Sequence, residues 1–89
     1  MRNMIKEGFI LRRMMSYNIV MGTDKLLKNR TSMLLLNDTG AIVFEGLKAG
    51  KSIDEVAESL MAEYDVTYEN VTADIMKTIS DLREAGVIE

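Results

Sequence analysis

The stretch "LNDTGAIVFEGLKAGKS", residues 36–52, ends in two glycines followed by lysine and serine, as a phosphate-binding loop does. Such a loop has four residues between its first glycine and the Gly-Lys-Ser, and it joins a strand to a helix. Here only three residues separate Gly46 from Gly50, and the residues before Gly46 have the pattern of a helix. Spacing and context therefore argue against a nucleotide site, and we interpret Gly50 as the boundary between two helices.

Capping residues mark the first two helices. Asn37 or Asp38 can accept a hydrogen bond from a backbone amide of the first turn, so a helix is predicted to begin there. We expect this helix to end just before Gly50, because glycine adopts the left-handed conformation most readily. Ser52 and Glu55 have the spacing of a capping box, which predicts the start of a second helix.

Apolar residues recur at helical spacing in the second and third helices. The series in the second helix is the strongest periodic signal in the chain. It consists of Ile53, Val56, Ala57, Leu60, Met61 and Tyr64. Thr67 is predicted to begin the third helix and Gly86 to end it. The apolar stripe of this helix consists of Tyr68, Val71, Ile75, Ile79 and Leu82.

Three short segments before residue 37 are rich in β-branched, aromatic or other apolar residues and are predicted to be strands. They are residues 8–14, 16–22 and 32–36. The polar stretch 23–31 is compatible with a long hairpin loop, a helical turn or a strand extension, and residues 87–89 are a candidate for a short terminal strand. Three strands followed by three helices predict a single α+β domain over residues 1–89, with the helices covering one face of the sheet.

The composition argues against catalysis. The chain has no histidine and no cysteine, so the usual general base and the usual thiolate and imidazole metal ligands are absent from it. Its carboxylates follow the solvent side of the predicted helices, without the spacing of a calcium loop. No apolar run approaches the roughly 20 residues of a membrane span. We expect a cytoplasmic protein that is not an enzyme and that binds neither a metal nor a cofactor.

Charge is distributed unevenly along the chain. Residues 1–37 contain seven basic and two acidic residues, whereas residues 38–89 contain four basic and twelve acidic residues. The helical part resembles a winged helix-turn-helix, which suggests DNA binding as the alternative function. A recognition helix, however, depends on Lys and Arg contacts to phosphates, and the third predicted helix is net negative. A nucleic-acid partner is therefore the second choice.

The third predicted strand, residues 32–36, lacks the features that usually protect a sheet edge. It contains no charge and no proline. It is therefore either the central strand, with its leucines in the core, or an edge left open for an incoming peptide strand. An open edge could also pair with that of a second copy, or the first strands could swap between two copies, and either arrangement would give a homodimer.

The extended stretch "LNDTGAIVFEGLKAGKSIDEVAESL" resembles the signature of the pyrroloquinoline quinone biosynthesis protein D family, the peptide-recognition element of pathways that modify ribosomally made peptides. Phe44 stands where the family often has Trp, which keeps an aromatic core residue, and the ending "LREAGVIE" is typical. The residues that carry the resemblance are Leu36, Asn37, Thr39, Gly40, Ala41, Leu47, Gly50, Ser52, Ile53, Glu55 and Val56.

The resemblance implies three antiparallel strands packed on three helices and a function without catalysis. It implies that the leader segment of a precursor peptide binds as an extra strand beside the third strand, and is delivered to a modifying enzyme, commonly a radical S-adenosylmethionine maturase. The corresponding strand edge consists of Ser32, Met33, Leu34, Leu35 and Leu36. The helical wall of the groove would be drawn from Val71, Ile75, Thr78 and Leu82, and the sequence leaves open which of these face the peptide.

Overall fold

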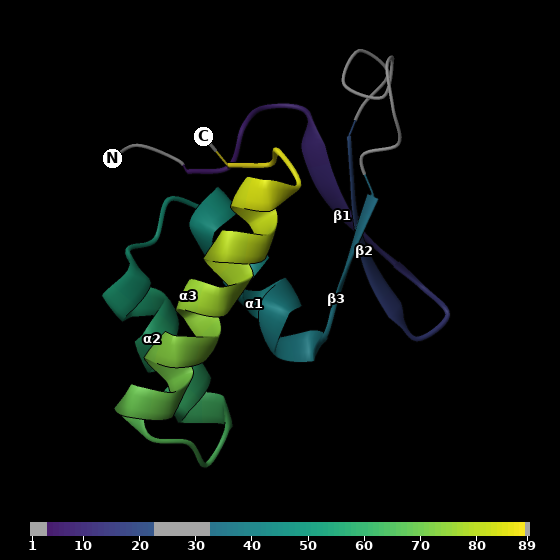
Figure 1. The fold of residues 1–89 in the computed structure, drawn as a ribbon. Coiled ribbons are helices and arrows are strands. Elements are labelled where there is room, and N and C mark those ends of the chain that lie inside the picture. The colour runs from purple at the N-terminus through teal and green to yellow at the C-terminus, as the bar shows by residue number, and fades with distance from the viewer. Residues whose placement is uncertain (1–3, 23–32, 89) are drawn as a thin grey trace.

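The computed structural model describes residues 4–22 and 33–88, with the side chain of Met33 excepted, and these form a three-stranded sheet followed by three helices (Figure 1). The strands are β1 (Phe9–Met14), β2 (Tyr17–Gly22) and β3 (Met33–Leu36). The helices are α1 (Asp38–Lys48), α2 (Ile53–Glu63) and α3 (Tyr68–Glu84). The predicted α+β class and the predicted order of elements are confirmed, while Ser32 and the stretch 23–31 lie outside the described residues.

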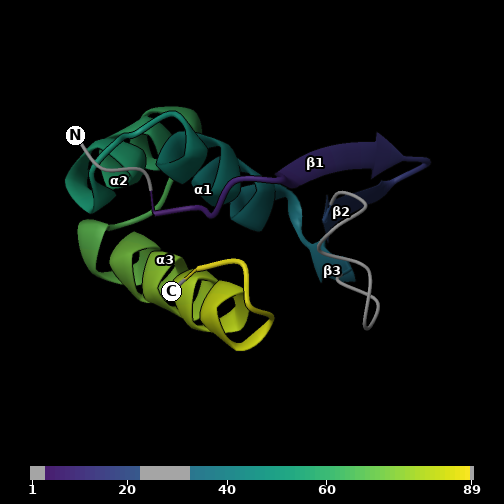
Figure 2. The same ribbon diagram turned by 90° about the horizontal axis from the view of Figure 1, so that it is seen from above.

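The sheet is antiparallel, with the strand order β1-β2-β3. Because side chains alternate along a strand, the register assigns each residue to one of two faces. One face contacts the helices through residues of the core and its margin, namely Phe9, Leu11, Val20, Leu34 and Leu36. The other face carries Ile10, Arg12, Tyr17, Ile19 and Leu35. All three helices lie on the same side of the sheet (Figures 1 and 2).

Hydrogen bonds at the helix starts explain why the helices begin where they do. The Asn37 side chain accepts a 2.7 Å hydrogen bond from the Gly40 amide, so Asn37 rather than Asp38 is the N-cap of α1. Ser52 and Glu55 form the predicted capping box, with reciprocal bonds of 3.1 Å and 2.8 Å. Thr67 is the N-cap of α3, as predicted. Gly50 and Gly86 have φ values of +89° and +85°, which confirms the left-handed glycines predicted at the helix ends.

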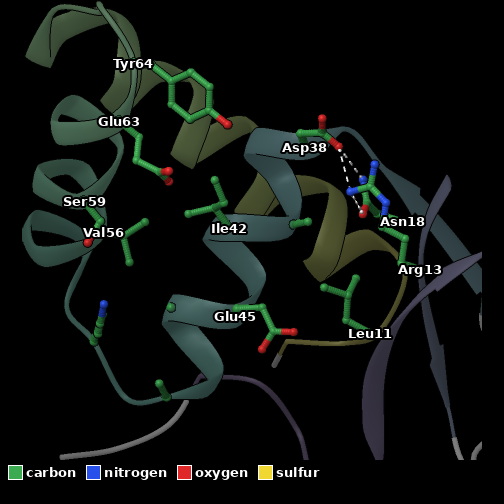
Figure 3. Close-up of a pocket in the computed structure, with 14 residues that line it drawn as sticks. Leu11, Arg13, Asn18, Asp38, Ile42, Glu45, Val56, Ser59, Glu63 and Tyr64 are labelled. Carbon is green, nitrogen blue, oxygen red and sulfur yellow. Dashed lines mark hydrogen bonds and ion pairs between the residues drawn. The ribbon is translucent and has the colours of Figure 1, made fainter. Parts of the chain in front are cut away.

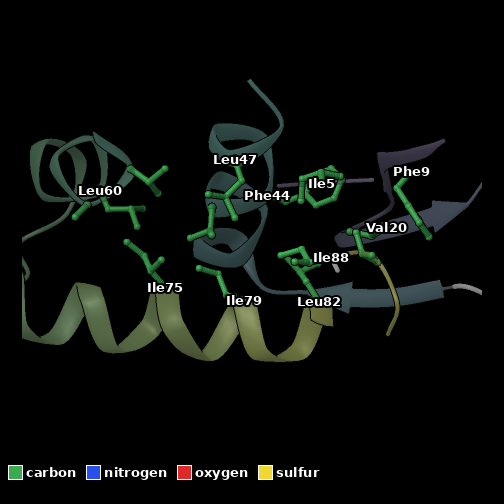
Figure 4. Close-up of a cluster of buried hydrophobic side chains, with 14 of the residues drawn as sticks. Ile5, Phe9, Val20, Phe44, Leu47, Leu60, Ile75, Ile79, Leu82 and Ile88 are labelled. Atoms are coloured by element: carbon green, nitrogen blue, oxygen red, sulfur yellow. The ribbon is translucent and has the colours of Figure 1, made fainter. Parts of the chain in front are cut away.

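The core lies between the helices and extends to the helix-facing side of the sheet (Figure 4). Its largest fully buried side chains include Phe44 and Leu47 from α1, Leu60 from α2, and Ile75 and Leu82 from α3. The two ends of the described chain join this core: Ile5 and Ile88 form an isolated antiparallel bridge, and the Lys6 amide donates to the Val87 carbonyl at 2.9 Å. The predicted terminal strand is therefore present as a single bridge.

Three residues of the predicted apolar stripes are exposed. Helix α2 ends at Glu63, and Tyr64 has an extended backbone, so helical spacing no longer directs its ring inwards. Met61 and Tyr64 are each 39% exposed. Tyr68 is 52% exposed in the first turn of α3, where its hydroxyl donates a 2.8 Å hydrogen bond to the Asp54 carboxylate of α2. This tyrosine was predicted to lie in the core, but it instead forms a polar contact between the starts of α2 and α3.

Candidate functional site

Strand β3 lies at an edge of the sheet. Within the described ranges 4–22 and 33–88, it pairs with β2 alone. Of the two interpretations of residues 32–36 given by the sequence, the edge strand is therefore correct for the described part, Met33–Leu36. Alternate residues of an edge strand direct their backbone N–H and C=O groups away from the sheet, where a further strand can bond to them.

The opposite edge, formed by β1, is better protected. The Lys48 ammonium group donates a 2.6 Å hydrogen bond to the Phe9 carbonyl, and it also lies 5.9 Å from the centre of the Phe44 ring. Arg12 and Arg13 add two exposed charges to this strand. Charges and covered backbone groups are the usual means of blocking the addition of strands. Since β3 contributes only methionine and leucines, it is the edge that is more accessible to a guest strand.

A groove of about 220 Å³ runs between the end of β3, the start of α1 and the middle of α3. It is lined by Leu35, Leu36, Asn37, Thr39, Asp74, Lys77, Thr78 and Asp81. On α3, Asp74, Thr78 and Asp81 follow the spacing i, i+4, i+7, so they lie on one side of the helix. The groove thus combines an open backbone edge with a largely polar helical wall.

Of the four α3 residues assigned to the wall by the resemblance, Thr78 alone lines this groove. Val71 is 3% exposed, and Ile75 and Leu82 are 0% exposed, because all three point into the core. On β3, Leu34 and Leu36 are half-buried against the core, whereas Leu35 is 61% exposed on the face without helices. Ser32 and the side chain of Met33 lie outside the described part of the chain.

Sequence reasoning missed the polar wall residues Asp74, Lys77 and Asp81. They follow directly from the helical repeat around Thr78, since positions three or four residues away share its side of the helix. The resemblance directed attention to the apolar stripe, which lies beside them and faces inwards. The signal was therefore present in the sequence as the polar positions adjacent to that stripe.

A polar network around the buried Asn18 positions the junction between β3 and α1. Asn18, only 3% exposed on β2, donates to the Leu36 carbonyl at 3.1 Å and to the Asp38 carboxylate at 3.0 Å. Arg13 of β1 completes the network, since it donates to the Asn18 side chain at 3.3 Å and lies 3.4 Å from the same Asp38 oxygen (Figure 3). This network connects all three strands to the start of α1, and so fixes the end of β3 that lines the groove.

A second and larger cleft, of about 680 Å³, lies between β1 and α2, with α1 between them (Figure 3). Its apolar lining includes side chains from three elements, namely Leu11 of β1, Ile42 of α1 and Val56 of α2. Seen from above, α1 lies between α2 and β1, and α3 and β3 are lower in the view (Figure 2). The cleft and the groove share no lining residue.

Neither hollow contains a recognisable catalytic arrangement. In the described ranges, no group of three or more metal-ligating side chains is close enough to hold a metal ion. Among the described residues, the hydrogen bond to Asp54, together with the negative charge of that carboxylate, raises the pKa of Tyr68 above its ordinary value of 10.0. Tyr68 lines neither the groove nor the cleft.

Comparison with known proteins adds a family and a fold. The sequence model of the family described as "Coenzyme PQQ synthesis protein D (PqqD)" matches residues 23–88. No match was found among curated proteins. Among solved structures, TbiB1 in complex with the TbiA(beta) leader peptide is 20% identical, with a TM-score of 0.77 over 96% of this chain and 93% of that chain.

A second solved structure, lasso peptide synthetase B1 complexed with the leader peptide, is 22% identical. Its TM-score is 0.76 over 96% of this chain and 94% of that chain. At these identities the two structures show a shared fold, which is the winged helix-turn-helix-like arrangement of sheet and helices described above. No described helix of this chain is long and apolar enough to cross a membrane.

Proposed function

Since this chain belongs to the PqqD family, we propose that it is a non-catalytic carrier that holds the leader segment of a ribosomally made precursor peptide. The leader binds as an additional strand along β3, Met33–Leu36, and lies in the groove beside α3. Main-chain hydrogen bonds to the edge supply affinity, and the side chains that line the groove supply selectivity. The carrier then presents the peptide to a modifying enzyme, a radical S-adenosylmethionine maturase in this proposal.

The observation that carries the proposal is the open edge of β3 next to a groove. Two proteins of the same fold, TbiB1 and lasso peptide synthetase B1, have been solved with leader peptides, which supports a peptide as the ligand. In this proposal, Leu34, Leu35, Leu36 and Thr78 contact the peptide. The buried Val71, Ile75 and Leu82 act from beneath the groove, by holding α3 in position against the core.

The alternative of DNA binding has little support from helix α3. This helix has four acidic and two basic residues, and its apolar face is buried in the core. Binding to duplex DNA draws most of its non-specific affinity from Lys and Arg contacts to phosphates. We expect no binding when the protein is titrated with a generic DNA duplex at low salt. Binding that weakens steeply as salt rises would instead favour the alternative.

The proposed function is tested by NMR titration of the isotopically labelled protein. The probe is a synthetic leader segment of a cognate precursor peptide. We expect the amides of residues 33–36 and of residues 74–81 to shift together, because one bound strand contacts both walls of the groove. Shifts confined to residues 4–14 would contradict the proposal, because they would move binding to the N-terminal segment and β1.

A matched pair of variants tests the edge itself. Leu35→Lys places a charge on the β3 edge, whereas Met14→Lys places the same charge at an exposed position of β1. Since charged side chains hinder strand addition, we expect Leu35→Lys to weaken leader binding several-fold and Met14→Lys to leave it unchanged. Equal effects of the two substitutions would mean that β3 is not the binding edge.

A further inference from the structure

The wall of the groove formed by α3 carries an uncompensated negative charge. Asp74 and Asp81 both line the groove, and they share one side of the helix with Thr78. The Lys77 ammonium lies 3.2 Å from Asp81 and offsets that carboxylate. Asp74 is exposed and has no ion-pair partner among the residues that the structure describes. A ligand in this groove therefore meets at least one carboxylate that no described basic side chain neutralises.

The surroundings of the groove strengthen this effect. Helix α3 contains Glu69, Asp74, Asp81 and Glu84 but only Lys77 and Arg83 as basic residues. Residues 38–89 as a whole contain twelve acidic and four basic residues. A surface with charge of predominantly one sign attracts ligands of the opposite sign and raises their association rate. The approach to the groove from the helical side thus favours a cationic segment.

The other side of a guest strand would meet a different environment. Side chains of a strand added to β3 alternate between the helix side and the face of the sheet without helices. On that open face, Leu35 is 61% exposed and is the cross-strand neighbour of Ile19. A guest residue on the same face lies directly beside Leu35, where apolar cross-strand pairs are favourable. The groove side is polar and acidic, whereas the open side is apolar.

We propose that this groove selects leader segments in which basic and large apolar residues alternate, an inference that rests on the proposed function. A lysine or arginine of the guest strand points towards Asp74, and the residues before and after it pack beside Leu35 on the open face. The ligand class is therefore a cationic, amphipathic β-strand. Asp74 is the specificity-determining residue that reads the charge.

The test uses two synthetic peptides that differ only in the sign of their charges. Both have glycine and serine flanks, and their cores are Val-Lys-Leu-Lys-Val and Val-Glu-Leu-Glu-Val. We expect the lysine peptide to bind about tenfold more tightly at low salt, and the difference to shrink as salt screens the charges. Asp74→Lys should reverse the preference. Glu58→Lys, the same charge change at an exposed position of α2 outside the groove, should preserve it.

Two outcomes would overturn the inference in distinguishable ways. If both peptides shift the amides of residues 33–36 with equal affinity, charge selection is wrong while strand addition at β3 stands. If Glu58→Lys changes the preference as much as Asp74→Lys does, the preference arises from net charge, and Asp74 does not read the ligand. The proposed function itself is contradicted by a different result, in which the leader peptide leaves residues 33–36 and 74–81 unperturbed.

Discussion

At the scale of single residues, Asn18 has the most concentrated structural role. Its side chain donates two hydrogen bonds and accepts one in an almost fully buried position, where it joins β2 to the end of β3 and the start of α1. Buried polar groups that lose their partners cost more than the lost bond itself, because they are no longer solvated. The shape of the groove at Leu36 therefore depends on a residue that does not line it.

Asn18→Leu is expected to lower the free energy of unfolding by about 1–3 kcal/mol, because the partly buried Leu36 carbonyl loses this donor, whereas the exposed Asp38 carboxylate stays solvated. Urea denaturation measures the change. Asn70→Ala is the control, because Asn70 is exposed and only its backbone amide, which alanine keeps, donates to the Thr67 hydroxyl. This substitution should alter the free energy of unfolding by less than about 0.5 kcal/mol. Equal losses in the two variants would show that the network contributes nothing specific.

Tyr68 gives a prediction of pH dependence. The hydrogen bond to Asp54 requires the protonated phenol, and it therefore raises the pKa of Tyr68 above 10.0. The contact is complete below the ordinary tyrosine pKa and is lost as the pH rises through the raised value. In a protein with Tyr17→Phe and Tyr64→Phe, tyrosinate absorbance reports Tyr68 alone, since the chain has three tyrosines. Asp54→Asn should lower the titration midpoint, and an unchanged midpoint would refute the contact.

At the scale of the elements, the approach of α1 and α2 depends on Gly46. A Cβ atom at this position would lie 2.7 Å from Cγ2 of Val56, closer than side chains tolerate. Because the two helices pack through this contact, the glycine that resembled part of a phosphate-binding loop has a packing role. Gly50, four residues later, has a φ of +89° and nothing near its missing side chain, so its role is conformational.

Gly46→Ala is expected to destabilise the protein by about 1–3 kcal/mol through overpacking against Val56. Adding Val56→Ala should relieve part of the clash. The double variant should therefore lose less free energy of unfolding than the sum of the two single losses. Thermal or urea unfolding of the wild type, the two single variants and the double variant gives this coupling. Strict additivity would contradict a direct contact between the two positions.

Much of the element structure followed from local signals in the sequence. The helix ends are determined by interactions within a few residues, and such local interactions can be predicted from sequence. The residues concerned are Ser52 with Glu55, Thr67, Gly50 and Gly86. The groove was less predictable, since it depends on how α3 is rotated against the sheet. That rotation buries Val71, Ile75 and Leu82 and leaves Thr78 at the groove, a difference of a fraction of a helical turn that long-range packing decides.

At the scale of the whole molecule, the sheet formed by the described residues has one protected edge, β1, and one open edge, β3. The β1 edge has Lys48 bonded to the Phe9 carbonyl and carries the charges of Arg12 and Arg13, whereas β3 has neither. In the described part of the chain, β3 is the more accessible edge, and one edge accepts one added strand. We therefore expect a leader peptide to bind with one site per chain, and unoccupied chains to compete for the same edge by pairing with each other.

This competition is measurable by light scattering at increasing protein concentration. We expect a concentration-dependent homodimer in the absence of peptide, and a return to monomers when a leader peptide occupies β3. Leu35→Lys should suppress the dimer as well, while Met14→Lys on β1 should not. A dimer that persists with saturating peptide would have to use a different surface.

The bridge between Ile5 and Ile88 also governs when this protein can fold during its synthesis. Ile5, Val87 and Ile88 all belong to the buried cluster, so the first and last described segments complete the same core. Contacts so distant in sequence form only after the intervening chain exists. While residues 87 and 88 remain inside the ribosome, the nascent chain lacks part of the interior on which α3 rests, and its β3 edge is exposed without a finished groove beside it. The groove beside β3 is therefore finished only after residues 87 and 88 have joined the core.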